Sequence, residues 1–283
     1  MSGDGRSITR HDEVLPKETR MPPRVVALYR YPVKGFTPEE CETLTVLDEG
    51  KIAGDRVLGI RFADTEAADD AWSKKTGMVA LVNTPGLARL RLRFDNKAFR
   101  LRISLGNAVL VDEALNPEGR KRIAAGLADY LLKLDDNPLS GHPERLPLRV
   151  IGDGLAPRYH DDEAGRVTLH GRGSLQALAS ALGTEVSELR FRSNLAVDGL
   201  DAWEEQRWVG RKIRVGAVAF DVVKPKTRCL ATHANPKTGE RDLPILTTLT
   251  QKIGQENPTF AVAMLPRSSG GQIHVGDQVT LLD

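Results

Sequence analysis

One cysteine lies among residues that suit chemistry. Cys229 follows three cationic side chains within five residues, Lys224, Lys226 and Arg228, and a turn region with proline and glycine comes after it. Cations near a cysteine favour the thiolate, which is the form that attacks electrophiles and binds soft metals. An inert cysteine at a strand end fits the same pattern, because free cysteine is among the most buried residue types. The residues alone leave a reactive and a structural Cys229 both open.

A second stretch could bind an anion. The glycine-containing segment His170 to Ser174 precedes an apolar run, Leu175 to Leu182, and Ser174 stands where the N-cap of a helix belongs. Backbone N–H groups at such a helix start are a natural anion site, although an ordinary capped helix without a ligand fits equally. The segment is not a dinucleotide fingerprint, because Gln176 occupies the position of the third glycine, and no phosphate-binding P-loop motif occurs.

Composition excludes several classes of protein. The 283 residues are 40% hydrophobic and 28% charged, as in ordinary globular chains, and this length favours two domains. A net charge of +2 leaves no broad basic surface for nucleic acid, and no apolar run is long enough to span a membrane. Two cysteines, Cys41 and Cys229, cannot build a disulfide scaffold or hold an iron–sulfur cluster unaided. Because the opening residues lack the apolar core of a signal peptide, we expect a cytoplasmic protein.

Local patterns predict many short strands and one long helix. Residues 117–134 carry apolar side chains at helical spacing, with Asn116 as a possible N-cap and Pro117 at the first helical position. Residues 136–147 hold three prolines and a glycine and predict a linker. We therefore expect a flexible tail over 1–23 and domains over 24–135 and 148–283. Strands are expected at 24–31, 42–47, 56–63, 79–82, 87–94, 99–104, 107–111, 148–151, 167–169, 212–223, 259–264 and 279–282.

Three stretches carry a resemblance to a known family. They are Tyr31-Pro32-Val33-Lys34-Gly35 with Gly54-Asp55-Arg56, then Arg192-Ser193-Asn194-Leu195, and finally Lys224-Pro225 through Arg228-Cys229 with Asn235-Pro236-Lys237-Thr238-Gly239. In this order, over nearly the whole chain after residue 23, they resemble the MOSC domain family, the C-terminal module of molybdenum cofactor sulfurases, together with the β-barrel domain that precedes it. The resemblance implies a mixed, β-rich α+β fold: a β-barrel-like N-terminal domain followed by a MOSC β-barrel with peripheral helices.

The resemblance also implies a cofactor and its ligands. The cofactor is the molybdenum cofactor, Mo-molybdopterin, with Cys229 as the catalytic residue and the metal ligand. The residues implied to hold the cofactor are Lys34, Arg56, Ser174, Arg192, Asn194, Thr227 and Arg228, together with Cys229. The chain departs from the family pattern at Gly35, His233, Asn235 and the segment 260–262, so its substrate pocket is expected to differ.

The function implied is reduction of an N-hydroxylated small molecule at a cysteine-bound molybdenum. Since the chain has neither an iron–sulfur motif nor a nicotinamide motif, we expect electrons from a separate ferredoxin-type or flavin-type donor protein. The alternative is a carrier in which Cys229 bears a persulfide or passes the cofactor on. A cysteine hydrolase using His160, His170 or His233 is a third reading, and it needs a base within hydrogen-bond reach of Cys229.

Overall fold

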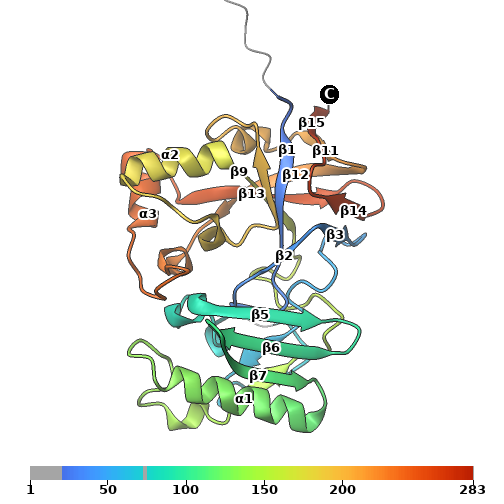
Figure 1. The fold of residues 1–283 in the computed structure, drawn as a ribbon. Coiled ribbons are helices and arrows are strands. Elements are labelled where there is room, and N and C mark those ends of the chain that lie inside the picture. Colours follow the sequence, from blue (N-terminus) through green and yellow to red (C-terminus); the bar gives the residue numbers. More distant parts are fainter. Residues whose placement is uncertain (1–20, 73–74, 283) are drawn as a thin grey trace, which may run out of the picture.

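A single curled sheet dominates the fold (Figure 1). The computed structural model describes residues 21–72 and 75–282, so most of the predicted tail, residues 1–20, lies outside the described residues. Eight strands hydrogen-bond in the order β15-β11-β12-β13-β9-β10-β1-β2, in which β9 and β10 run parallel and all other neighbours run antiparallel. The strands are β1 (Arg24–Arg30), β2 (Glu39–Cys41), β9 (Val167–Gly171), β10 (Leu195–Asp198), β11 (Lys212–Val215), β12 (Val218–Thr227), β13 (Thr259–Pro266) and β15 (Val279–Leu282).

The two ends of this sheet approach each other. The backbone N–H of Val25 donates to the carbonyl of Asp277 at 2.8 Å, and that of Val279 donates to Pro23 at 2.8 Å. Inward side chains from β1, β9 to β13 and β15 meet in one buried cluster that includes Val197 and Phe220. Because alternate residues of a strand face opposite sides, a curled sheet can enclose such a core. The predicted β-rich α+β class is confirmed.

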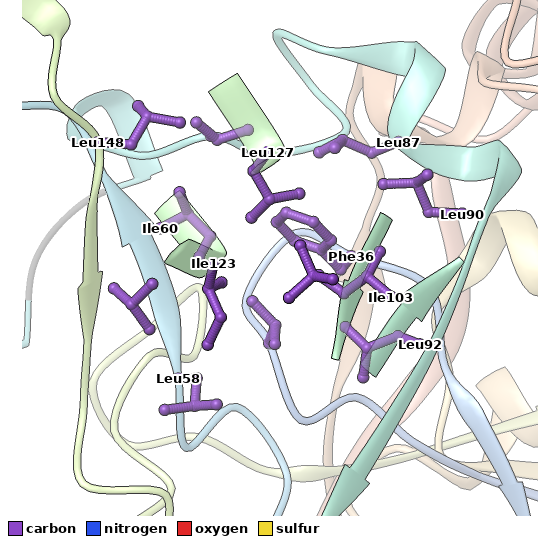
Figure 2. Close-up of a cluster of buried hydrophobic side chains, with 14 of the residues drawn as sticks. Phe36, Leu58, Ile60, Leu87, Leu90, Leu92, Ile103, Ile123, Leu127 and Leu148 are labelled. Carbon is purple, nitrogen blue, oxygen red and sulfur yellow. The ribbon is translucent and has the colours of Figure 1, made fainter. Parts of the chain in front are cut away.

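A smaller layer lies beside this sheet. An antiparallel meander of β5 (Leu90–Asp95), β6 (Arg100–Leu105) and β7 (Ala108–Ala114) is covered by α1 (Pro117–Leu131) (Figure 1). The Asn116 side chain accepts from the N–H of Gly119 at 2.8 Å, which confirms the predicted N-cap. Figure 2 shows the buried side chains of this layer in one cluster, with Phe36 near its centre and Ile123 and Leu127 of α1 beside it.

Strand pairs join distant parts of the chain. β3 (Thr43–Val46) pairs with β14 (Gly271–His274), and β4 (Gly59–Arg61) pairs with β8 (Arg149–Ile151). Together with the pairing of β1 and β10, these contacts cross the expected linker at 136–147. The two-domain division stays a prediction. Any such division must allow strands from before residue 136 to pair with strands from after residue 147.

The remaining elements are short apart from α2. They are α2 (Arg172–Leu182), α3 (Ile245–Thr247), the 3-10 helices Lys75–Gly77, Pro85–Arg89, Pro143–Arg145, Glu188–Phe191, Glu205–Trp208 and Leu230–His233, and a π-helical turn Thr248–Lys252. No helix within the described ranges is long and apolar enough to cross a bilayer.

Two local predictions are wrong. β9 runs directly into α2, so Gly171 rather than Ser174 takes the N-cap position, and Ser174 lies inside the first helical turn. The strand predicted at 79–82 is a turn instead, because the N–H groups of Asn83 and Thr84 both donate to the carbonyl of Ala80.

Candidate functional site

Cys229 lies at the end of the longest strand, in a pocket walled by both parts of the chain. β12 ends at Thr227, and Cys229 precedes the 3-10 turn Leu230–His233. The Thr232 hydroxyl and N–H donate to the carbonyl of Cys229 at 2.9 and 3.0 Å and fix this turn. Lys75, which is distant in sequence, reaches the half-buried thiol with Nζ 3.6 Å from Sγ. The first half of the chain therefore supplies part of the cysteine's surroundings.

The pocket is strongly cationic. In the described part of the chain its walls carry eight cationic side chains: Lys34, Arg56, Lys75, Arg166, Arg190, Arg192, Lys226 and Arg228. They also carry two carboxylates, those of Asp161 and Asp162. The cavity has a volume of about 100 Å³ and adjoins a groove of about 950 Å³, with Leu81 and Arg192 among the residues that line both. So many cations around one cavity suit a polyanionic ligand.

Two arginines share one aromatic ring. The guanidinium carbons of Arg56 and Arg192 lie 5.0 and 4.5 Å from the ring centroid of Tyr31, which is a cation–π arrangement. Both arginines have positive φ, 53° and 55°, in the region that side chains other than glycine rarely occupy. Arg56 pairs with Asp55, whereas the hydrogen bond of Arg192 goes to the carbonyl of Phe36. Strained backbone that aims two cations at one place is typical of a binding site.

Lys34 is buried and binds the loop 159–161 through its ammonium group. Its Nζ donates to the carbonyls of Tyr159 and His160, each at 2.9 Å, and to Asp161 Oδ1 at 3.1 Å, which uses all three of its N–H donors. Burial lowers the pKa of Lys34 in spite of the opposing charge of Asp161. Lys34 and Arg56 in turn outweigh the effect of burial on Asp161 and hold the pKa of that carboxyl well below its usual range. Lys34 thus holds the 159–161 loop against the pocket.

Burial and neighbouring positive charges lower the pKa values of several basic groups of the pocket. Arg228 donates from Nη1 to the carbonyl of Phe191 at 2.5 Å, and burial lowers the pKa of Arg228 to about 10. Burial, followed by the charge of Arg228, lowers the pKa of Lys226 to about 8. Burial and the charge of Arg56 lower the pKa of His160 to about 2, so this imidazole is neutral at physiological pH. Positive charge is in excess here, as expected of a site that accepts an anion.

The structure brings most of the predicted site residues together. Those on the pocket wall are Lys34, Arg56, Arg192, Thr227, Arg228 and Cys229. Asn194 and Ser174 do not line it. Asn194 is buried, accepts from the Thr168 N–H and hydroxyl at 3.2 and 3.0 Å, and donates to the carbonyl of Tyr29 at 3.1 Å. Asn194 therefore ties β9 to β1.

Ser174 is buried as well, and its hydroxyl is hydrogen-bonded to other protein groups. Its hydroxyl donates to Glu205 Oε2 at 2.8 Å and accepts from the N–H of Trp203 at 2.8 Å. Glu205 is fully buried, and burial raises the pKa of its carboxyl. The serine thus hydrogen-bonds one oxygen of a buried carboxyl group, and neither residue lines the pocket.

Sequence reasoning missed several pocket residues. Lys75, Arg166, Arg190 and Asp161 reach the pocket from loops and short turns whose local sequence resembles a solvated surface. Long-range packing alone places them there, so no local signal could have identified them.

The arrangement does not favour hydrolase chemistry. Among the described contacts, the hydrogen-bond partner of the Cys229 thiol is Lys75. His170 lies 3.3 Å from Glu188, and His233 Nε2 accepts from the N–H of Leu246 at 3.3 Å. His170 and His233 thus have other partners. His160 lines the pocket with a buried Nε2 that has no hydrogen-bond partner among the described residues, and no hydrogen bond joins it to Cys229 there. The described residues also contain no group of three or more His, Cys, Asp or Glu side chains able to hold a metal ion.

Comparison with known proteins identifies the second half of the chain. Residues 156–280 match the MOSC domain model. A molybdenum cofactor sulfurase of Caenorhabditis elegans is 31% identical over 136 residues, which cover 47% of this chain and 18% of the relative. The mitochondrial amidoxime-reducing component 1 of Mus musculus is 30% identical over 118 residues, covering 38% of this chain and 34% of the relative. The chain thus spans less than two thirds of either relative.

Among solved structures, the YUAD protein of Bacillus subtilis matches 92% of this chain and 94% of its own, at 10% identity and a TM-score of 0.41. This likeness carries no structural conclusion. The family model, by contrast, covers the residues that surround Cys229, including Arg192 and Arg228. The chain thus contains a MOSC domain, which the family model matches over residues 156–280.

Proposed function

We propose that this chain is an oxidoreductase that binds the molybdenum cofactor and reduces N-hydroxylated small molecules, with Cys229 as the protein ligand of molybdenum. The observation that carries the proposal is the position of Cys229 on the wall of a cavity lined by eight cationic side chains of the described chain. A thiolate suits a soft metal already held by dithiolene sulfurs, and the cations suit the cofactor's terminal phosphate. The similarity to the mouse amidoxime-reducing component supports the reaction class.

The residues present fit such a group. Burial among other cations lowers the pKa values of Lys226 and Arg228, so an anionic ligand would relieve an existing excess of positive charge. The cavity of about 100 Å³ continues into the groove of about 950 Å³. Binding sites for small molecules commonly have volumes of about 300–1,000 Å³, so the two spaces together have room for a pterin.

Each side chain then has a role that its contacts support. Arg56 and Arg192, which are stacked on Tyr31, would hold the phosphate through guanidinium hydrogen bonds. Arg228 and Thr227 would hold the cofactor next to Cys229, and Lys34 would keep the 159–161 loop in place.

When bound, the cofactor would supply the two electrons that break the N–O bond of the substrate. The balanced reaction also consumes two protons and releases the amine or amidine and one water. The protein's part is to fix the cofactor and to orient the substrate beside it. The electrons would reach the site from a separate donor protein of the ferredoxin or flavin type.

The test is replacement of the thiol. We expect Cys229→Ser, made in a host that synthesises the cofactor, to fold normally but to lose bound molybdenum, because a neutral hydroxyl is a poor ligand for a soft metal. Metal and pterin are quantified on the purified protein, and reduction of an amidoxime is measured with an artificial low-potential donor. Cys41→Ser is the matched control, because Cys41 packs against the sheet core away from the pocket. Full activity in Cys229→Ser, or equal loss in both variants, would refute the assignment.

A carrier function is the second candidate. The similarity to molybdenum cofactor sulfurases and a half-buried thiol beside Lys75 favour a Cys229 that bears a persulfide or passes the cofactor on. Purified protein with labile sulfane sulfur and without stoichiometric molybdenum would support the carrier. Stoichiometric molybdenum with pterin and turnover would support the reductase.

A further inference from the structure

Two lysines next to Cys229 have no carboxylate partner in the described part of the chain. Lys75 Nζ is 3.6 Å from Cys229 Sγ, and Lys226 lines the same cavity from the end of β12. Four other pocket cations are paired with carboxylates: Arg56 with Asp55, Arg166 with Asp162 at 3.0 Å, Arg190 with Asp242 at 2.7 Å, and Lys34 with Asp161. Arg192 and Arg228 donate to the backbone carbonyls of Phe36 and Phe191 instead. Lys75 and Lys226 are each half-buried, so their charges are partly removed from water. The carboxylates of Asp161 and Asp162 act on them only from beyond ion-pair distance.

These lysines come from other segments of the chain than the stacked arginines. Arg56 and Arg192 lie over Tyr31, at the exit of β1, and are the residues assigned above to the cofactor phosphate. Lys75 and Lys226 come from two separate segments, a 3-10 turn of the first half and the last residues of β12. One phosphate does not need both groups of cations, so the lysine pair is available to another anion.

We propose that the substrate of this site carries an anionic group, such as a carboxylate, and that Lys75 and Lys226 bind that group beside Cys229. The inference rests on the proposed function, because it deepens the assignment of the same pocket. An N-hydroxylated compound with a carboxylate a few bonds from the N–O group would place its anion between the two ammonium groups and its N–O bond near the cysteine sulfur. Charge pairing of this kind orients a substrate as well as attracting it.

The test compares two reagents of nearly equal size on the cofactor-free protein. Iodoacetate is anionic and iodoacetamide is neutral, and both alkylate Cys229. The ratio of their rates, measured at one pH, cancels any difference in thiolate population. We expect this ratio to be about tenfold higher at Cys229 than for N-acetylcysteine, and to fall about fivefold in Lys75→Met and in Lys226→Met. Lys75→Arg should retain most of the preference.

Lys121→Met is the matched control, since this exposed lysine on α1 pairs with Glu118 far from the pocket. The same variants are then loaded with cofactor and assayed on benzamidoxime and on its 4-carboxy derivative. Molybdenum is quantified on each variant, and rates are expressed per bound molybdenum. The lysine variants should raise KM for the carboxylate substrate several-fold more than KM for benzamidoxime.

The outcomes separate this inference from the proposed function. A ratio equal to that of N-acetylcysteine, or one that neither lysine variant lowers, overturns the anion site even if the protein binds molybdenum. Protein that never binds molybdenum overturns the proposed function, while the alkylation ratio still reports whether the lysine pair recognises an anion.

Discussion

At the scale of single residues, the pocket depends on arginines held in unusual conformations. Arg192 has a φ of 55°, stacks on Tyr31 and hydrogen-bonds to the carbonyl of Phe36 rather than to a carboxylate. Burial, and then the charge of Arg56, lowers the pKa of Arg192. This side chain is therefore fixed in place while its charge remains uncompensated, which is the state that an anionic ligand would stabilise.

We predict that Arg192→Ala lowers cofactor occupancy. A charge-assisted hydrogen bond contributes about 1.5–3 kcal/mol, so the cofactor should dissociate at least about tenfold more readily. Arg192→Lys keeps the charge but not the planar fork and should fall in between. Molybdenum content after extensive dialysis is the measurement, with the exposed Arg93→Ala as control. Occupancy equal to that of the unmodified protein would show that Arg192 is structural.

The residues found from sequence and those missed differ in one physical respect. Lys34, Arg56, Arg228 and Cys229 belong to ordered local motifs, so a linear reading could identify them. Lys75 reaches Cys229 across 154 sequence positions, and nothing in its local sequence distinguishes it from a solvated lysine.

At the scale of elements, the start of α2 illustrates how tertiary contacts override a local signal. Ser174 has the residue type and the setting of an N-cap, yet the helix begins at Arg172. Its hydroxyl instead serves Glu205, which lies 31 positions later and is buried. The sequence predicted the helix itself, because periodicity is local, but not its first residue, because that depends on a distant carboxyl group.

Glu188 joins three elements around the same helix. Its carboxylate accepts from the Tyr29 hydroxyl of β1 at 2.8 Å and from the Arg172 guanidinium of α2 at 2.9 and 3.0 Å, and it lies 3.3 Å from His170 of β9. Burial raises the pKa of Glu188, but hydrogen bonds from His170 and Arg172 outweigh it and hold this pKa well below its usual range. The charged form is therefore favoured by folding.

Because the pKa of Glu188 is lowered in the folded state, stability depends on pH. A carboxyl group whose pKa is lower in the folded state contributes stability above its unfolded pKa of about 4.3, and that contribution is lost as the pH falls through the folded pKa. We predict that Glu188→Gln lowers the free energy of unfolding at pH 7 by about 1–3 kcal/mol and that the difference shrinks below about pH 4.

Urea unfolding at several pH values provides the measurement. Glu118→Gln is the matched control, because Glu118 forms an exposed pair with Lys121 on α1 and should change stability little. A Glu188→Gln variant whose deficit is the same at pH 7 and pH 3 would contradict the linkage.

At the scale of the whole molecule, strands from both ends of the chain share sheets. β1 pairs with β10 and so completes a sheet built mostly from the second half, and β3 pairs with β14 in a separate two-stranded sheet. The sequence predicted most of these strands and the β-rich class, because alternation and turn residues are local signals. It could not predict which strands pair, since pairing between distant segments leaves no local mark. The division at 136–147 therefore rested on local proline and glycine content.

The pocket lies where these parts of the chain meet, and this placement gives a prediction for the whole molecule. Lys34, Arg56 and Lys75 come from the first half, whereas Arg192, Arg228 and Cys229 come from the second. A ligand that contacts residues of both halves stabilises the folded state of both halves. At a free concentration 100 times its dissociation constant, it contributes about 2.7 kcal/mol.

We therefore predict that cofactor-loaded protein melts in one cooperative transition, with a Tm on the order of 5 °C above that of the cofactor-free form. Differential scanning calorimetry of both forms is the measurement. Cys229→Ser prepared in the same host serves as control, and its Tm should match the cofactor-free form. If loading instead separates the melt into two transitions and moves only one of them, the two halves unfold independently and the cofactor contacts one wall alone.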